Sequence, residues 1–350
     1  MKMFKRIIAG TMVAVIGLLA TACSDTTWAY KQGDINVTSG MYLAMVANAY
    51  DSARSQLEDS TANVFTQKIE EKDGSVWIND KIKESVDLYI AIERQFADLK
   101  LELTEEENTA INTQVNSSWE QGKDYYTENG IGKDSFTKIV ANATKTQKVF
   151  EAIYGAKGSS EVKNAELKPF YYENFAAVKF IAIPLANAET GAPLEEKEVK
   201  AADKKAAGYL KRIKNGENIE KLIKENYLES IPKDQRKEAE KQIPADNLTI
   251  MQKEDANYPV GLVEKVFKAK AGAKQTVTAD QFIFVFEKLD IKKFDKTQFK
   301  NYRATALSQF KGEDFLADMK AFAETLKIES NAASIARYVA KNIKDVTSQA

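Results

Sequence analysis

Histidine is absent from this chain, and cysteine occurs once, at Cys23, among 350 residues. Without imidazole the chain cannot form a Ser-His-Asp or Cys-His catalytic group, nor a zinc site with a histidine ligand. A single thiol forms no intrachain disulfide and no multi-cysteine metal site. Proline and glycine are also scarce, at 6 and 16 residues, which predicts long helices with few tight turns. Any activity must therefore do without imidazole and without paired thiols.

Residues 1–22 have the pattern of a secretory signal peptide. A short basic stretch that ends at Arg6 precedes an apolar run from Ile7 to Ala22, and the chain turns polar directly after Cys23. A transmembrane anchor is the alternative, but a spanning helix needs roughly twenty apolar residues, more than this run offers. A cysteine directly after small residues resembles the lipobox of bacterial lipoproteins. The resemblance implies an acylated Cys23 and a mature chain that is lipid-anchored on the extracytoplasmic side of a bacterial envelope membrane.

The overall composition is that of a folded protein. Charged residues make up 29% of the chain and hydrophobic residues 44%, which is enough for a sizeable core. Lys and Arg number 50 against 51 Asp and Glu, so the formal net charge is −1. Because there is no basic excess and no Lys/Arg face interleaved with aromatic residues, we expect no nucleic-acid partner.

The pattern of residues 27–155 predicts a short hairpin followed by a helical domain. Residues 27–37 favour two short strands around a turn at 32–34, and Thr38 or Ser39 is positioned to cap a helix from about residue 40. Thr104-Glu105-Glu106-Glu107 has the sequence of a capping box. Apolar residues at helical spacing predict further helices at about 78–100, from 104 to a break at 130–132, and from about 134 to 155.

A different pattern covers residues 166–291. Residues 177–183 alternate and then become apolar, as in a strand that Pro184 ends. The polar stretch 228–255 gives no clear assignment. The other expected elements are helices at 166–174, 195–226 and 261–269, and strands at 275–277 and 282–289.

Beyond residue 295 the pattern is helical again, with expected breaks at Gly312 and near Asn331. Helical segments at both ends with a small α+β unit between them predict an α+β fold that is mainly α.

Two short motifs are interpreted as turns. The segment 130–135 is faintly like a phosphate loop, but Thr127 stands where the first glycine is required. The segment 70–74 is faintly like a calcium loop, but Ile69 stands in place of the first aspartate. We therefore predict no catalytic residue, no cofactor and no metal site.

Several segments, taken in order, resemble one known family. They are Gly33–Tyr42, Leu103–Glu107, Glu166–Asn174, Leu210–Leu222, Val263–Gly272 and Thr276–Leu289. Together with the lipobox they are similar to the PrsA/SurA-like foldases, in which helical segments from both chain ends pack together around an inserted parvulin-type peptidyl-prolyl isomerase domain. The resemblance implies a signal peptide at 1–22, an N-terminal helical domain at 23–165, a parvulin-like domain at 166–291, and C-terminal helices at 292–350 that pack on the N-terminal domain.

Phenylalanine stands where active parvulins carry their two histidines. Phe180 matches the position in the first strand, and Phe284 matches the one in the last strand to within one or two residues. The resemblance therefore implies a fold and a class of client, but no active site. Apolar walls in place of the histidines could still hold a proline or an aromatic residue in a groove formed by Phe180, Leu262, Phe282 and Phe284. The alternative is that these side chains are simply the core of the insert, which is the commoner role of an aromatic row on a strand.

The resemblance implies a membrane-anchored chaperone or foldase for secreted proteins, with peptidyl-prolyl isomerase activity weak or lost. Its partners would be unfolded or partly folded secreted polypeptides and, through Cys23, the lipid bilayer. The alternatives are an active parvulin-type isomerase, a solute-binding lipoprotein of a transporter, which would need two α/β lobes, and a structural envelope lipoprotein. Six side chains on the helical segments are possible client contacts, although each also fits a core position: Tyr42, Met45, Tyr50, Trp77, Trp119 and Tyr126.

Overall fold

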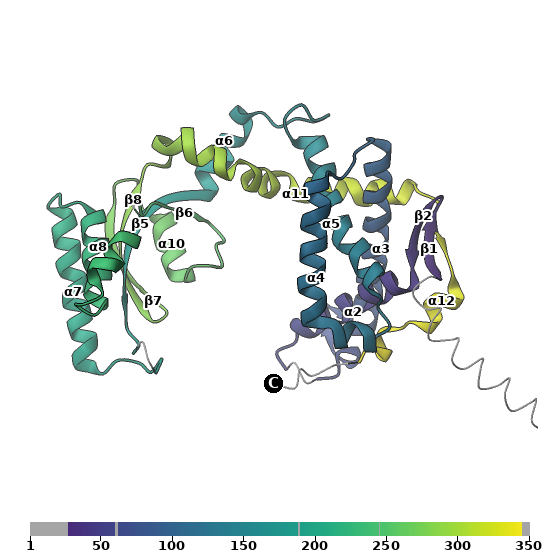
Figure 1. Cartoon of the computed structure of the whole chain (residues 1–350), viewed down its shortest axis with the longest axis horizontal. Helices are drawn as coiled ribbons and strands as arrows, with labels where there is room; N and C mark the ends of the chain where they lie inside the picture. Colours follow the sequence, from purple (N-terminus) through teal and green to yellow (C-terminus); the bar gives the residue numbers. More distant parts are fainter. Residues whose placement is uncertain (1–26, 60–61, 188–189, 245, 345–350) are drawn as a thin grey trace, which may run out of the picture. The chain divides into compact units, whose positions relative to one another are not determined.

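The chain forms two units (Figure 1). Unit 1 combines the N-terminal part up to Glu161 with the C-terminal part from Lys311, and unit 2 comprises Val162–Phe310. The expected insert, 166–291, lies within unit 2. The predicted fold class, α+β and mainly α, is confirmed. The computed structural model describes residues 27–59, 62–187, 190–244 and 246–344.

The predicted signal peptide and Cys23 lie outside the described residues. Among the helices that the structure does describe, none combines the length and the hydropathy that crossing a membrane requires.

Unit 1 begins with a hairpin that the end of the chain extends to three strands. β1 (Trp28–Gln32) pairs with β2 (Ile35–Thr38) across a turn at Gly33, whose φ of 60° is one that glycine adopts without strain. β9 (Glu329–Ser330) adds to β1, which gives the order β2-β1-β9. The sequence predicts the hairpin but not β9, because a strand of two residues carries no readable period.

Four long helices form the body of unit 1. Thr38 caps the first of them, since its Oγ1 accepts a hydrogen bond from Met41 N–H at 3.2 Å. The predicted capping box is present, with Thr104 N–H donating to Glu107 Oε2 at 2.7 Å and Glu107 N–H to Thr104 Oγ1 at 3.2 Å. The helices are α2 (Ser39–Ser55), α3 (Gly74–Asp98), α4 (Glu105–Glu128) and α5 (Lys133–Tyr154).

A short excursion separates α2 from α3. The 3₁₀ turn η1 (Val64–Thr66) leads into β3 (Lys68–Ile69) and β4 (Lys72–Asp73), which pair with each other. Gly74 opens α3 at a point of close contact, because a Cβ at this position would lie 2.0 Å from the Val64 carbonyl oxygen.

The C-terminal part of the chain completes unit 1. Phe315 packs edge-on against Phe150, with ring centroids 5.4 Å apart, and the Tyr154 hydroxyl donates to Asp318 Oδ2 at 2.9 Å. After β9 come α12 (Ala332–Arg337) and the 3₁₀ turn η4 (Ala340–Asn342). Lys344 N–H donates to Asn129 Oδ1 at 2.8 Å, and Asn129 Nδ2 donates to Lys344 O at 3.1 Å. Residues from both chain ends therefore share one core.

Unit 2 is built on a four-stranded sheet of order β6-β5-β8-β7. All strand pairings in this sheet are antiparallel, as are those recorded elsewhere in the described residues, so the paired α/β lobes of a solute-binding lipoprotein are not found there. The strands are β5 (Phe175–Pro184), β6 (Thr249–Gln252), β7 (Lys274–Ala279) and β8 (Phe282–Leu289). β6 falls in the stretch 228–255, which has no clear assignment from its residue pattern.

Helices cover the two faces of this sheet (Figure 1). α7 (Glu196–Lys214) and α8 (Ile219–Ser230) pack on the face that carries Ile181 and Val285. α10 (Val260–Lys268) packs on the opposite face. Further helical elements of unit 2 are α6 (Asn164–Asn174), α9 (Arg236–Gln242), the 3₁₀ turn η2 (Ile291–Phe294) and the π-helical turn η3 (Asp295–Phe299), which leads into α11 (Lys300–Thr325).

The expected helix break at Gly312 is wrong. α11 (Lys300–Thr325) runs through this residue without interruption. A single glycine costs a helix only about 1 kcal/mol relative to alanine, so the packing of its neighbour Phe315 outweighs that cost. The expected break near Asn331 agrees with the structure, where Asn331 caps α12.

We expect Gly312→Ala to raise the free energy of unfolding by about 0.5–1 kcal/mol, because alanine has less conformational freedom to lose than glycine. The added methyl group would meet no atom within 4 Å. Gly74→Ala is the matched control of opposite sign, since its Cβ would collide with the Val64 carbonyl. Urea denaturation of both variants measures the difference, and a destabilised Gly312→Ala chain would contradict the helical role of this residue.

Candidate functional site

Four aromatic rings form a row on the α10 side of the sheet in unit 2. Side chains in a strand alternate between the two faces, so the even-numbered residues of β5 and β8 share one face. Phe282 and Phe284 lie 5.7 Å apart between ring centroids, and Phe284 and Phe180 also lie 5.7 Å apart. Tyr258, from the segment before α10, meets Phe180 edge-on at 5.8 Å. The structure thus brings together Phe180 and Phe284, the two positions that the sequence resemblance matches to the parvulin histidines.

The row is part core and part surface. Leu262 is fully buried and Phe284 is 4% exposed, so for these two predicted groove residues the core interpretation describes the structure. Phe282 is 38% exposed and Phe180 is half-buried. The row therefore passes from the interior of unit 2 to its surface, and at Phe282 it offers an accessible aromatic ring.

Val260 adds a second exposed apolar side chain at the same end of the sheet. It is 73% exposed at the start of α10. The next residue, Gly261, sits so close to β7 that a Cβ there would lie 3.2 Å from Ala279 Cβ, and Ala279 pairs in register with Phe282. We call Phe180, Tyr258, Val260, Phe282 and Phe284 the aromatic face.

The polar group of the aromatic row is the Tyr258 hydroxyl. Burial raises the pKa of Tyr258, while its hydrogen bond with Thr249 acts in the opposite direction. The phenol therefore stays protonated near neutral pH and can donate or accept a hydrogen bond, but it is no substitute for an imidazole that exchanges protons in this range.

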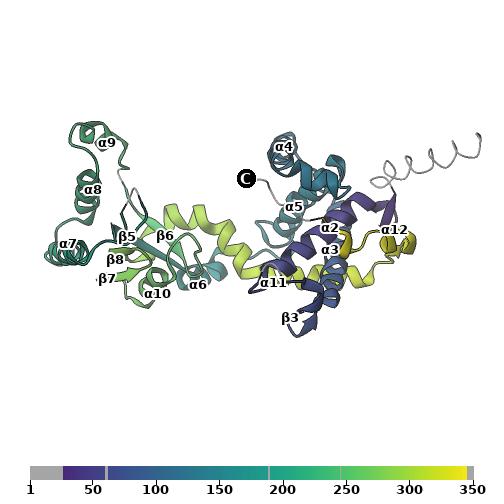
Figure 2. The ribbon, with the colours of Figure 1, turned by 90° about the horizontal axis from the view of Figure 1, so that it is seen from below.

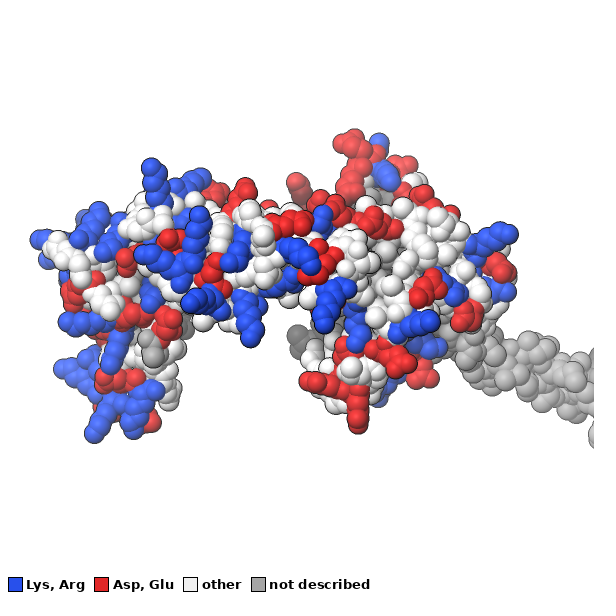
Figure 3. All heavy atoms as spheres, turned by 90° about the horizontal axis from the view of Figure 1, so that it is seen from above, with Lys and Arg blue, Asp and Glu red and all other residues white. Residues whose placement is uncertain are grey.

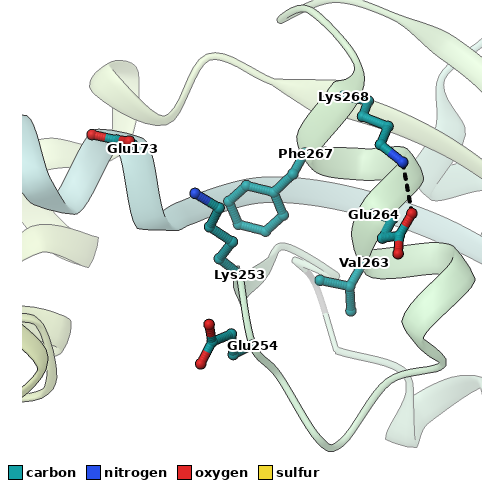
Figure 4. Close-up of a pocket in the computed structure, with 7 residues that line it drawn as sticks. All are labelled: Glu173, Lys253, Glu254, Val263, Glu264, Phe267 and Lys268. Carbon is teal, nitrogen blue, oxygen red and sulfur yellow. Dashed lines mark hydrogen bonds and ion pairs between the residues drawn. The ribbon is translucent and has the colours of Figure 1, made fainter.

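A pocket of about 490 Å³ lies on the other side of α10 (Figure 4). Val263 and Phe267 of α10 form its apolar part, and Phe267 is directed toward Lys253 in the segment after β6. On the rim, Lys268 Nζ lies 2.6 Å from Glu264 Oε2. The remaining lining residues are Glu173 and Glu254.

Lys288 lies over the ring of Phe267, with Nζ 5.5 Å from the ring centroid. Burial lowers the pKa of this ammonium group. A pocket with an apolar floor and charged residues of both signs suits an amphipathic side chain, but nothing in it forms a catalytic arrangement. Among the residues that the structure describes, no group of three or more Asp, Glu or Cys side chains could hold a metal ion.

The six possible client contacts of unit 1 do not form a surface. Tyr42, Met45, Trp77 and Trp119 are buried in the core, which corrects the expectation that they face a client. Tyr50 stacks on Phe65 at 5.8 Å, and Tyr126 stacks on Trp119 at 5.4 Å, so each of the other two is half-buried beside one of two separate hydrophobic clusters of unit 1.

Sequence reasoning missed Tyr258, Val260 and Phe267. Phe267 belongs to the helix predicted at 261–269, and Val260 directly precedes it, but the period of that helix alone did not separate exposed from buried positions. Tyr258 lies in a connecting segment, where no period exists to place a side chain.

On the face seen in Figure 3, basic and acidic side chains are interspersed, so this face has no field of one sign to attract a charged ligand.

No protein-family model matches the chain, and no curated protein matches it. Solved structures of foldase PrsA are similar to it. The structure from Streptococcus pneumoniae is 9% identical, covers 74% of this chain and 89% of its own, and has a TM-score of 0.35. The one from Bacillus subtilis is 19% identical, with coverages of 74% and 91% and a TM-score of 0.32. The one from Lactococcus lactis is 12% identical, with coverages of 90% and 100% and a TM-score of 0.37. Foldase PrsA is a member of the family that the sequence segments resemble.

We expect Phe284→Ala to lower the free energy of unfolding by about 3–5 kcal/mol, because it leaves a cavity in the core of unit 2. Phe282→Ala should lower it by only about 1 kcal/mol, since its ring is already partly in water. Chemical denaturation followed by far-UV circular dichroism separates the two. Equal losses would mean that Phe282 belongs to the core and offers no accessible surface.

Proposed function

We propose that this chain is a membrane-anchored extracytoplasmic chaperone or foldase for secreted proteins, with weak or no peptidyl-prolyl isomerase activity. The observation that carries the proposal is the aromatic face of unit 2. There a row of rings reaches the surface at Phe282 and is extended by Val260, in a chain without a single histidine.

Weak apolar contact is the mechanism that fits this face. Covering an exposed Phe or Val side chain with a client contributes about 1–3 kcal/mol at most, which alone gives dissociation constants of millimolar or weaker. Such contacts form and break rapidly, and they demand little of the client beyond an apolar or aromatic side chain. An unfolded segment is held through several of them, and it leaves when folding buries the same side chains in the client.

Catalysis of prolyl isomerisation is disfavoured by the same residues. The barrier of a peptide bond is about 18–20 kcal/mol, and an enzyme lowers it by desolvating the twisted amide and orienting polar groups around it. Phe180 and Phe284 provide desolvation without polar groups, and the Tyr258 hydroxyl is what remains in the row. Binding of a proline without efficient isomerisation is the expected result.

The anchor belongs to the proposal through Cys23. Acylation at this thiol by two or more chains would hold the protein stably at the membrane, whereas one chain binds only marginally. Localisation at the membrane surface places the aromatic face where secreted chains emerge unfolded. Metabolic labelling of Cys23 with an acyl probe, absent in Cys23→Ala, tests this part separately.

The test of the function measures the aggregation of an unfolding client with and without the full-length chain, beside a prolyl-peptide isomerisation assay. We expect Phe282→Ala to require about tenfold more protein for the same suppression, because an aromatic anchor is lost. The matched control is Tyr227→Ala, since Tyr227 is 41% exposed on α8, on the opposite side of the sheet.

Suppression that survives Phe282→Ala, or that falls equally in Tyr227→Ala, would remove the aromatic face from the mechanism. Strong isomerisation that Phe282→Ala abolishes would instead favour an active isomerase with an unusual site.

A further inference from the structure

β7 is the outer strand of the sheet in unit 2 (Figure 2). It pairs with β8 along its whole length, from Lys274 to Ala279, and no other strand of the described residues pairs with its far edge. α7 and α10 lie against β7 on the two faces of the sheet, which leaves the edge itself between them. The opposite border is β6, which has only four residues.

The hydrogen bonds of β8 determine which groups this edge exposes. Leu185 N–H donates to Gln281 O at 2.7 Å on the β5 side, and Lys288 N–H donates to Ala273 O at 2.9 Å on the β7 side. Backbone groups of a strand alternate between its two neighbours. Odd-numbered residues of β8 therefore bond to β5, and even-numbered residues bond to β7.

The register then assigns the residues of β7. Gln275, Val277 and Ala279 stand opposite even-numbered residues of β8, so their backbone groups are used within the sheet. Thr276 and Thr278 lie between them and direct their N–H and C=O groups away from β8, toward the outer edge. Thr278 is exposed and Thr276 is half-buried, which agrees with an open edge.

Between Lys274 and Ala279, β7 has few of the features by which proteins usually protect an edge. Exposed edges are blunted by proline, by bulges, by inward-pointing charges or by very short strands. β7 has six residues, contains no proline, and pairs with β8 in register over this range. A bulge directly precedes it, where Gly272 N–H donates to Lys288 O at 2.7 Å and Lys288 N–H donates to Ala273 O. Its one charged residue is Lys274, whose Nζ donates to Ile213 O at 2.7 Å at the end away from the turn.

We infer that an extended, uncharged segment of a non-native polypeptide adds to the sheet as a fifth strand beside β7. This deepens the proposed function and rests on it. The outward backbone N–H and C=O groups of Thr276 and Thr278 bind the main chain of the client. These hydrogen bonds require no particular side chain of the client.

The occupant follows from what adjoins the edge. Val277 pairs with Phe284 and Ala279 with Phe282, so a strand added to β7 continues the sheet that carries the aromatic face. The residues that border it, Thr276, Val277 and Thr278, are uncharged, and two of the three are threonines with high strand propensity. An uncharged segment rich in β-branched residues complements them.

The probe is a fluorescent peptide of alternating Thr and Val, offered to the full-length chain and followed by anisotropy. Thr278→Pro should weaken binding about tenfold, because it removes an outward N–H and places a ring at the edge without removing a bond to β8. Thr278→Ala keeps the N–H and should weaken binding far less than Thr278→Pro does, so it separates loss of the side chain from loss of the backbone donor. The same peptide N-methylated at alternate residues should bind the unaltered chain about tenfold less tightly, which tests the inference even if the proline variant does not fold.

Amide exchange locates the contact. On peptide binding we expect the amides of Thr276 and Thr278 to exchange at least about tenfold more slowly, whereas those of Val277 and Ala279, already bonded within the sheet, change little. If the amides of Thr276 and Thr278 stay unprotected while Phe282→Ala still impairs aggregation suppression, the edge is not used. The inference then fails while the proposed function stands.

If the chain neither binds the peptide nor suppresses aggregation, both the inference and the proposed function fail. If the two amides become protected with rising protein concentration and no peptide, a second copy of the chain occupies the edge, and the inference is overturned.

Discussion

The organisation of unit 2 depends on one constraint, which is that the central strands β5 and β8 are apolar on both faces. Ile181, Ile183 and Val285 face one way, and Phe180, Phe284 and Phe286 face the other. Two helices, α7 and α8, cover the first face. One shorter helix, α10, covers the second, and it has only nine residues. Within the aromatic face, Phe282 and the half-buried Phe180 are the rings that this single helix leaves at least partly uncovered, so the candidate site results from how the sheet is packed.

The helical unit follows from a different requirement, which is that its core is completed by distant parts of the sequence. Phe150 packs on Phe315, and the side-chain amide of Asn129 makes two of its hydrogen bonds with the backbone of Lys344. β9 joins β1 in the same way. The aromatic side chains of this unit are used in that core, which is why Tyr42, Trp77 and Trp119 offer no surface and the exposed rings are found in unit 2.

Local signals were enough to predict much of this fold from the sequence. Caps at Thr38 and Thr104 and the alternation in 282–289 specify their elements without reference to the rest of the chain. Features decided by tertiary contact were not predictable. Gly312 stays helical because Phe315 packs on Phe150, β9 exists because β1 offers an edge, and Tyr258 faces Phe180 from a segment without periodicity. For the candidate site, the sequence identified the rings but not which of them reach the surface.

Under the proposed function, phenyl rings stand in the aromatic row where the resemblance matches two parvulin histidines, and this changes what the site could do with a bound proline. An imidazole pair would need hydrogen-bond partners, and its charge would depend on pH between about 5 and 8. Phe180 and Phe284 need no partners and meet edge-on at an interplanar angle of 73°, an arrangement that is itself stabilising. On this proposal the phenyl rings form an apolar support and themselves carry no group that titrates in this pH range. Such a surface would hold a client for as long as the client exposes apolar groups, and the phenyl rings would not select the twisted amide over the planar one.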